Sequence, residues 1–187
     1  MFSSANTFTV DTTPPMVSLT SPTNGSYTND VQPSFNGTAG MQPGDQATVS
    51  VDVYSGASAS GSPLETLTGQ AGPDGSYSVQ PSSPLAQGTY TAQAQQSDAA
   101  GNVGVSSANT FTVDTTPPVV SLTAPADDSY TNNTVPSFAG TAGTQPGDQA
   151  TVTVDVYSGS SASGSPVQRL TVQAGRVARI RCRHPLR

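Results

Sequence analysis

Short stretches in which apolar and polar residues alternate recur along the chain. Val49, Val51 and Val53 are each followed by a polar residue, so they share one side of an extended segment. Residues 89–94 and 110–113 show the same alternation. Because successive side chains of a β-strand point to opposite faces, this period of two predicts strands with one buried and one solvated face.

Turn-forming Gly, Pro, Asn and Asp residues separate seven such stretches. The predicted strands are residues 17–21, 33–38, 48–54, 64–68, 76–80, 89–97 and 105–113. The strong helix formers Glu, Lys and Leu are scarce, which favours an all-β fold. Seven short strands in about one hundred residues are typical of an immunoglobulin-like β-sandwich.

One tyrosine matches a feature of such sandwiches. The segment PLAQGTY places Tyr90 at the start of the sixth predicted strand. In a tyrosine corner, a hydroxyl at this position bonds back to the preceding turn. An ordinary core tyrosine is the alternative.

The chain contains a long internal repeat. The sequence SSANTFTVDTTPP begins at Ser3 and again at Ser106, and residues 3–72 are identical to residues 106–175 at 54 of 70 positions. A unit of this length is an independent domain rather than a solenoid repeat. We therefore predict tandem sandwiches, the second of them truncated.

This register predicts four segments. They are the last strand of a preceding repeat with its linker (1–13), a complete domain (14–116), the N-terminal part of a second domain (117–175) and an aberrant Arg-rich tail (176–187).

The repeat stops abruptly after Gly175. The tail reads RVARIRCRHPLR, where the first copy continues PDGSYSVQPSSP. A natural terminal segment and a reading-frame slip both account for this change; we favour the slip, which would leave Cys182, His184 and the arginines without function. The second copy would then lack counterparts of residues 76–80, 89–97 and 105–113 and form no complete sandwich.

Charge is distributed very unevenly. All six basic residues lie at or after Arg169, and all twelve acidic residues lie before it. Residues 1–168 therefore carry a formal charge of −12, which disfavours nucleic acid and anionic membranes as partners. The sequence contains no apolar run that could span a membrane and no signal peptide, and its single cysteine excludes a disulfide framework.

Residue types suited to catalysis are few. The only histidine is in the tail, lysine is absent, and Glu65 is replaced by Gln168 in the second copy. Serine and threonine are abundant but have no base to activate them. We expect no enzymatic activity.

At the level of motifs, the chain resembles a known family. The segments FTVDTTPP, YTND, PSFNGTAG, VDVYSG and GTYTAQAQQSDAAGN are similar to the tandem bacterial Ig-like repeats of large surface adhesins and biofilm-associated proteins. The resemblance covers residues 3–175. It implies a secreted or cell-surface location and a stalk role, with neighbouring repeats of the same longer chain as the partners.

Oxygen-bearing side chains suggest one metal site. Asp98, Asn102 and Asp114 lie in SDAAGN and VDTTPP, which we place near the junction between consecutive domains. Calcium prefers carboxylate and amide oxygens, and similar Ig-like adhesins hold calcium at such junctions. Ordinary turn and linker chemistry is the alternative for all three residues.

Three functions stay open at this point. The first is a non-catalytic structural spacer, because consecutive prolines in DTTPP make a stiff linker. The second is an adhesive module that binds glycan or protein directly. The third is a spacer within a secreted multidomain enzyme. We rank the first highest because the sequence shows no exposed aromatic platform for sugars, and it names no adhesive ligand.

Overall fold

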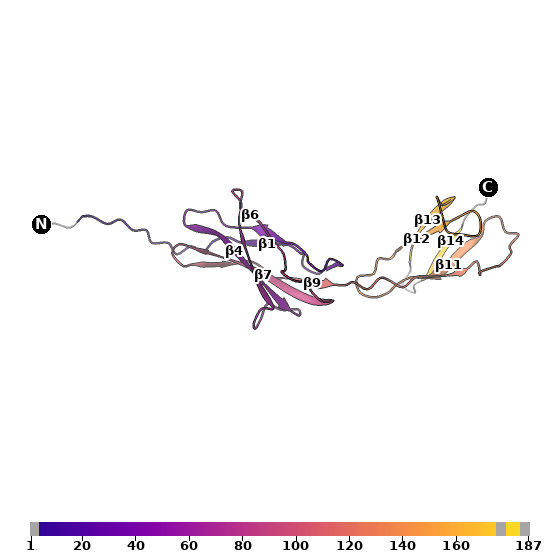
Figure 1. Cartoon of the computed structure of the whole chain (residues 1–187), viewed down its shortest axis with the longest axis horizontal. Coiled ribbons are helices and arrows are strands. Elements are labelled where there is room, and N and C mark those ends of the chain that lie inside the picture. Colours follow the sequence, from indigo (N-terminus) through magenta and orange to yellow (C-terminus); the bar gives the residue numbers. More distant parts are fainter. Residues whose placement is uncertain (1–3, 175–178, 184–187) are drawn as a thin grey trace. The chain divides into compact units, whose positions relative to one another are not determined.

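The computed structural model is built from strands and turns and describes residues 4–174 and 179–183 (Figure 1). No helix occurs among these residues, and the predicted all-β fold class is confirmed. The chain divides into two compact units, Met1–Thr115 and Thr116–Arg187, and each is described by itself.

The described residues of the first unit form nine strands. Their bounds are β1 (Ser18–Ser21), β2 (Ser26–Thr28), β3 (Phe35–Thr38), β4 (Asp45–Ser55), β5 (Glu65–Gln70), β6 (Ser76–Val79), β7 (Gly88–Asp98), β8 (Val103–Val105) and β9 (Asn109–Val113).

These strands form the two sheets of a β-sandwich. One sheet has the order β1-β3-β6, and the other has the order β2-β9-β7-β4-β5, with β8 also paired to β7. Neighbouring strands are antiparallel except β2 and β9, which run parallel with Ser26 opposite Phe111 and Thr28 opposite Val113. The long strand β7 is central, because β4 covers one of its edges and β8 and β9 cover the other.

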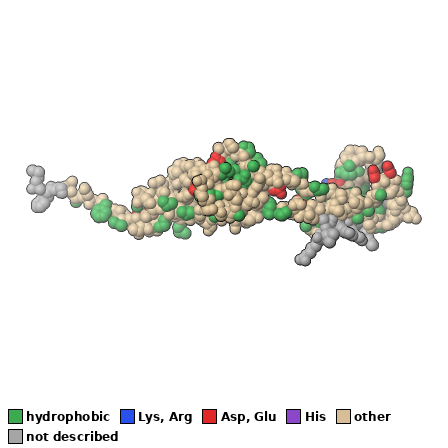
Figure 2. Space-filling model, turned by 90° about the horizontal axis from the view of Figure 1, so that it is seen from below, with side chains coloured by type: hydrophobic (Ala, Val, Ile, Leu, Met, Phe, Trp, Pro, Cys, Tyr) green, Lys and Arg blue, Asp and Glu red, His purple; other side chains and the backbone are tan. Residues whose placement is uncertain are grey.

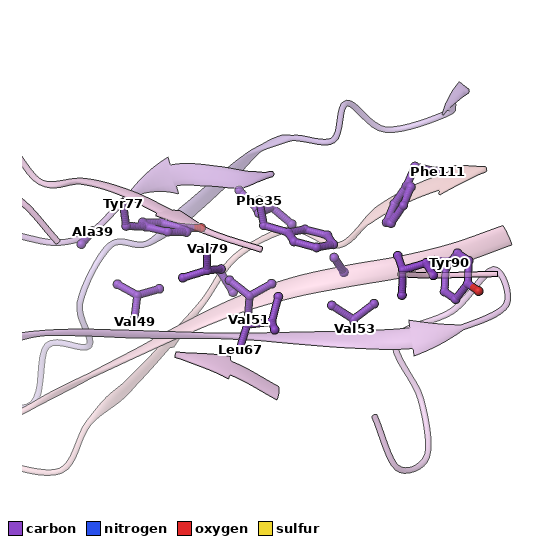
Figure 3. Close-up of a cluster of buried hydrophobic side chains, with 14 of the residues drawn as sticks. Phe35, Ala39, Val49, Val51, Val53, Leu67, Tyr77, Val79, Tyr90 and Phe111 are labelled. Carbon is purple, nitrogen blue, oxygen red and sulfur yellow. The ribbon is translucent and has the colours of Figure 1, made fainter. Parts of the chain in front are cut away.

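Aromatic rings fill one part of the core between the sheets (Figure 3). Phe35 meets Phe111 edge to face with ring centroids 5.7 Å apart, and Tyr90 stacks on Phe111 at 5.8 Å. Each such contact adds about 0.5–1.5 kcal/mol to the effect of burial alone. The predicted alternation in β4 is confirmed, since Val49 and Val51 are buried and point from this strand toward the opposite sheet (Figure 3).

Six of the seven predicted strands match one observed strand each, and the seventh is two strands. The predicted segment 105–113 begins at the last residue of β8 and contains β9, and the three residues from Ser106 to Ala108 lie between these strands. The Ser106 hydroxyl accepts a hydrogen bond from the Ala94 N–H at 2.9 Å and donates to the Ser107 carbonyl, so it interrupts the ladder. The sequence pattern also missed β2, which has only three residues.

The tyrosine corner is present. The Tyr90 hydroxyl donates to the Ala86 carbonyl at 2.9 Å. Tyr90 is also buried in the core. It therefore fills both roles that the sequence offered as alternatives.

The second unit has strands β10 (Ser121–Ala124), β11 (Ser137–Thr141), β12 (Thr151–Val156), β13 (Gln168–Gln173) and β14 (Arg179–Arg183). They form a three-stranded sheet, β10-β11-β14, and a two-stranded sheet, β12-β13. The register between β10 and β11 reproduces that between β1 and β3: Ser121 lies opposite Thr141 as Ser18 lies opposite Thr38.

The strand β14 corrects one expectation. Cys182 lies opposite Phe138 as Val79 lies opposite Phe35, with the same offset of 103 residues in both strands. The prediction that the second copy lacks a counterpart of residues 76–80 is therefore wrong. His184 lies outside the described residues.

The physical reason lies in the local sequence and in the edge it meets. In RIRCR an arginine precedes and follows each of the two apolar residues, so the segment keeps the period of two that a strand requires. Pairing with it satisfies the backbone N–H and C=O groups along one edge of β11. The strand β14 thus takes the place of β6 although its residues differ.

Apolar side chains in the second unit are less well covered than their counterparts. Leu122 is 55% exposed, whereas Leu19 at the same position of the first repeat is 8% exposed. The described residues of the second unit include no equivalent of β7 or β9, which cover this core in the first. That part of the chain forms an incomplete sandwich, as predicted.

The missing strands also change the partners of one aspartate. Asp52 of β4 accepts hydrogen bonds from Thr66 and from Gln95 of β7. Its counterpart Asp155 instead receives two hydrogen bonds from Arg169, at 2.7 and 3.0 Å. The arginine replaces a threonine and occupies both carboxylate oxygens.

Candidate functional site

The turn that follows β7 is closed by the Asp98 carboxylate. Its Oδ1 accepts hydrogen bonds from the N–H groups of Ala100 and Asn102, at 2.9 and 2.8 Å, and its Oδ2 accepts one from the Asn102 side-chain amide at 2.7 Å. Asp98 is only 2% exposed. A buried carboxylate with these partners fixes the conformation of residues 98–102.

These hydrogen bonds favour the ionised form of Asp98. The Asn102 amide is the main cause that holds the pKa of Asp98 below its usual value, and backbone N–H groups of the turn act in the same direction against the cost of burial. The ionised carboxylate is therefore favoured in the folded state, where the neutral N–H groups of Ala100 and Asn102 donate to it.

Asn102 also reaches the segment that leads into the domain. Its Nδ2 donates a second hydrogen bond, at 3.0 Å, to the main-chain carbonyl of Asp11. Asp11 begins the sequence DTTPP, residues 11–15, which we call the linker. A side chain from the end of β7 thus holds the start of the linker.

The linker continues across a glycine of β8. A Cβ atom on Gly104 would lie 1.9 Å from the Pro15 carbonyl oxygen, which leaves no room for any other residue. Pro15 is buried, whereas Thr12, Thr13 and Pro14 are exposed. Asn102 and Gly104 therefore form the contact site of the linker on the domain that follows it.

A buried glutamine stabilises the loop that lies across from the linker. Gln96 of β7 accepts a hydrogen bond from the Gly40 N–H at 2.6 Å and donates to the carbonyls of Gly40 and Gln46, at 3.0 and 2.8 Å. Gln96 is almost fully buried and fixes the loop between β3 and β4. Sequence analysis missed it, because a glutamine inside an alternating strand resembles a solvated residue.

A hollow of about 670 Å³ lies between the linker and residues 39–45. It contains two carboxylates, and both are used in turns: Asp11 accepts the Thr13 N–H at 2.9 Å, and Asp45 accepts the Gln42 N–H at 2.9 Å. The remaining side chains around it are neutral. The hollow contains no pair of nucleophile and base.

The three predicted calcium ligands do not come together. Asp98 and Asn102 are neighbours, but Asp114 follows Val113, which pairs with Gly88 at the opposite end of β7. Neighbouring antiparallel strands run in opposite directions and therefore finish at opposite ends of the sheet, which the sequence interpretation overlooked. The linker residue close to Asn102 is Asp11, the equivalent of Asp114 one repeat earlier.

The carboxylates near this turn form no metal-binding group among the described residues. The described residues contain no group of three or more His, Cys, Asp or Glu side chains placed to hold a metal ion. On the face shown in Figure 2, acidic side chains lie scattered among neutral ones. Calcium binding by Asp98, Asn102 and Asp114 stays a prediction, although the linker aspartate beside Asn102 in this domain is Asp11.

Comparison with known proteins identifies the family. A family model described as a bacterial Ig-like domain matches residues 18–115, which is more than half of the chain. The chain belongs to the bacterial Ig-like domain family. No curated protein matches it.

This chain is also similar to a solved structure. It is described as "Structures of Clostridium thermocellum CbhA fibronectin(III)-like modules" and shares 18% sequence identity with this chain. The match covers 89% of this chain and 78% of the other, with a TM-score of 0.49.

Bacterial Ig-like domains are typically non-catalytic structural modules and commonly occur in extracellular proteins. In the described part of the chain, no helix is long and apolar enough to cross a membrane.

Proposed function

We propose that this chain is a spacer segment of a bacterial cell-surface or secreted protein, in which consecutive Ig-like repeats carry another domain away from its anchor. The proposal rests on one observation: the chain enters and leaves the complete repeat at opposite ends of β7. The linker is held beside Asn102, after the last residue of β7, and Val113 pairs with the first, Gly88.

The separation of these ends sets the reach of each repeat. Strand β7 has 11 residues, and an extended residue advances the chain by about 3.3 Å, so entry and exit lie about 35 Å apart. A module with adjacent termini would add little length. This one adds the length of an 11-residue strand.

The strand pairing also suits a load-bearing role. When the chain is pulled at its two ends, β9 is drawn along the parallel strand β2. Three residue pairs, from Ser26–Phe111 to Thr28–Val113, connect the two strands. Hydrogen bonds that lie across the direction of pull must break together rather than one after another.

Pulling on single molecules of the full chain tests the proposal. The first unit should resist as one unit and then release roughly 300 Å of chain, since each of its about 100 residues extends by up to about 3.5 Å. Extension of this unit without a force peak would overturn the load-bearing role.

The alternative of an adhesive module is tested by binding. We expect neither a glycan array nor cultured cells to retain the full chain above the level of an unrelated Ig-like domain. Saturable binding that survives removal of residues 176–187 would place adhesion in the repeats and overturn the spacer role.

A further inference from the structure

Two hydrogen bonds hold the same position of the repeat from opposite sides. Asp114 donates its main-chain N–H to the Thr28 carbonyl at 2.8 Å, at the exit of the domain. Its equivalent 103 residues earlier, Asp11, accepts a hydrogen bond on its main-chain carbonyl from Asn102 at 3.0 Å, at the entry of the domain.

We propose that, in a run of consecutive repeats, this aspartate is held by both neighbours at once. Its N–H is bound by the repeat that precedes it and its C=O by the repeat that follows. The entry end of each repeat is then an interaction surface for the linker that joins it to the preceding copy, with Asn102 and Gly104 as its central residues. This inference rests on the spacer function proposed above and specifies how its joints are built.

The rest of the linker is anchored as well. On the side of the preceding repeat, the Thr115 hydroxyl donates to the Gln87 side chain at 3.1 Å, and Thr115 is the equivalent of Thr12. Within the linker itself, the Thr13 N–H is held by the Asp11 carboxylate at 2.9 Å.

The last two positions are prolines. The ring of Pro14 fixes its own φ and restricts the residue before it. Pro15 is buried, with its carbonyl against Gly104. Each position of the linker is thus restrained. The aspartate, the first threonine and the second proline contact a repeat, the second threonine is bound to the aspartate, and the first proline is restricted by its ring.

Such a joint is short. Val113, the last buried residue of one repeat, corresponds to Val10. Only four residues separate Val10 from Pro15, the first buried residue of the next repeat. Ordinary flexible linkers bend because their residues lack such contacts.

Asn102 acts as the positioning residue. Both protons of its side-chain amide are used, one by Asp98 and one by Asp11. Because the Asp98 carboxylate also fixes the main chain of the turn, the amide is oriented toward the linker before the linker binds. Such preorganisation lowers the entropic cost of ordering the joint.

Backbone ¹⁵N relaxation of the full chain tests the entry half. We expect Asp11, Thr12 and Thr13 to have order parameters of about 0.85, like the strands. In Asn102→Ala these values should fall below about 0.6. Asn109→Ala is the matched control, because Asn109 also donates two hydrogen bonds, to the Leu19 and Pro22 carbonyls, away from the linker.

Gly104→Ala gives a second route to the same result if Asn102→Ala fails to fold. The added Cβ would collide with the Pro15 carbonyl and displace the linker. A linker that is as mobile as residues 4–8 in the unmodified chain, or that is unaffected by both variants, would overturn the inference. An equal loss of order in Asn109→Ala would do so too, because it would show general loosening of the domain.

Hydrogen exchange of the Asp114 amide tests the exit half. We expect slow exchange, and no change in Asn102→Ala, because Thr28 rather than Asn102 holds this group. Exchange as fast as that of the amides of residues 4–8 would overturn the exit half. Neither measurement depends on force or ligand binding. A loose joint would therefore overturn this inference without overturning the spacer function, and a rigid joint is compatible with an adhesive protein.

Discussion

The phenolic oxygen of Tyr90 lies 2.9 Å from the Ala86 carbonyl oxygen, four residues earlier in the chain. The hydroxyl donates this hydrogen bond while the ring stacks on Phe111 inside the sandwich. One side chain therefore ties the turn before β7 to the core, at the end from which the chain leaves the domain.

Removing this hydroxyl should weaken the first unit without disturbing its packing. We expect Tyr90→Phe to lower the free energy of unfolding by about 1 kcal/mol, because the ring contact remains and one hydrogen bond is lost. Thermal melting of the full chain measures the effect. Tyr27→Phe, on a half-exposed side chain, should leave the melting temperature nearly unchanged; equal shifts for the two variants would contradict a structural role for the corner.

Equivalent phenylalanines of the two units should differ in their effect on the main unfolding transition. Phe35→Ala removes a fully buried ring that contacts Phe111 and should cost about 3–5 kcal/mol. We expect the main melting transition to fall by more than about 10 °C. Phe138→Ala, the same change one repeat later, should not move that transition. A shift in both variants would mean that the two units unfold as one.

Stability of the first unit should decrease in acid through Asp98. The pKa of Asp98 is lower in the folded state than its usual 3.8, so the unfolded chain binds more protons as the pH falls. The stabilisation is complete above about pH 4 and is lost as the pH falls toward the lower folded-state pKa.

Urea unfolding between about pH 6 and pH 2 measures this dependence. We expect a shallower slope in Asp98→Asn. Some slope should remain, because hydrogen bonds from Ser76 also lower the pKa of Asp74. An unchanged slope in Asp98→Asn would remove Asp98 from the explanation.

Melting of the full chain in calcium and in chelator separates two accounts of the entry end. An ion bound to Asp98, Asn102 and Asp11 would raise the melting temperature in calcium and lose that effect in Asp98→Asn. If the hydrogen bonds of Asp98 alone fix the turn, the two temperatures should agree. Magnesium at the same concentration controls for general ionic screening.

The two units should also differ in hydrogen exchange. We expect slow amides within residues 14–113 and fast exchange after about residue 117, because the described part of the second unit contains no equivalents of β7 and β9 to cover it. Within the second unit, the amides between β11 and β14 should be the slowest. Equal protection in both units would show that a partner molecule completes the second sandwich.

The sequence alone was sufficient where the controlling interactions are local. Alternation of Val49, Val51 and Val53 identified a strand with one buried face, because the period of two is a property of the extended backbone. The position of Tyr90 after a turn and before an apolar strand predicted the corner as one of two roles, since its partner is only four residues away. Repetition of whole motifs identified the domain length.

Only the tertiary structure decided which distant residues meet. Asp98 and Asp114 are near in sequence but lie at opposite ends of β7, because the antiparallel strands β7 and β9 run in opposite directions. Asp11 and Asn102 are distant in sequence, yet an amide joins them.

The tail shows the same limit of sequence reasoning. RIRCR has an unusual composition, but a strand requires only alternation and an edge with which to pair, and β11 provides that edge. Short-range alternation identified most of the segments that become strands in the first unit. The pairing of strands across the chain, which depends on backbone hydrogen bonds between remote segments, decided which side chains form the joint.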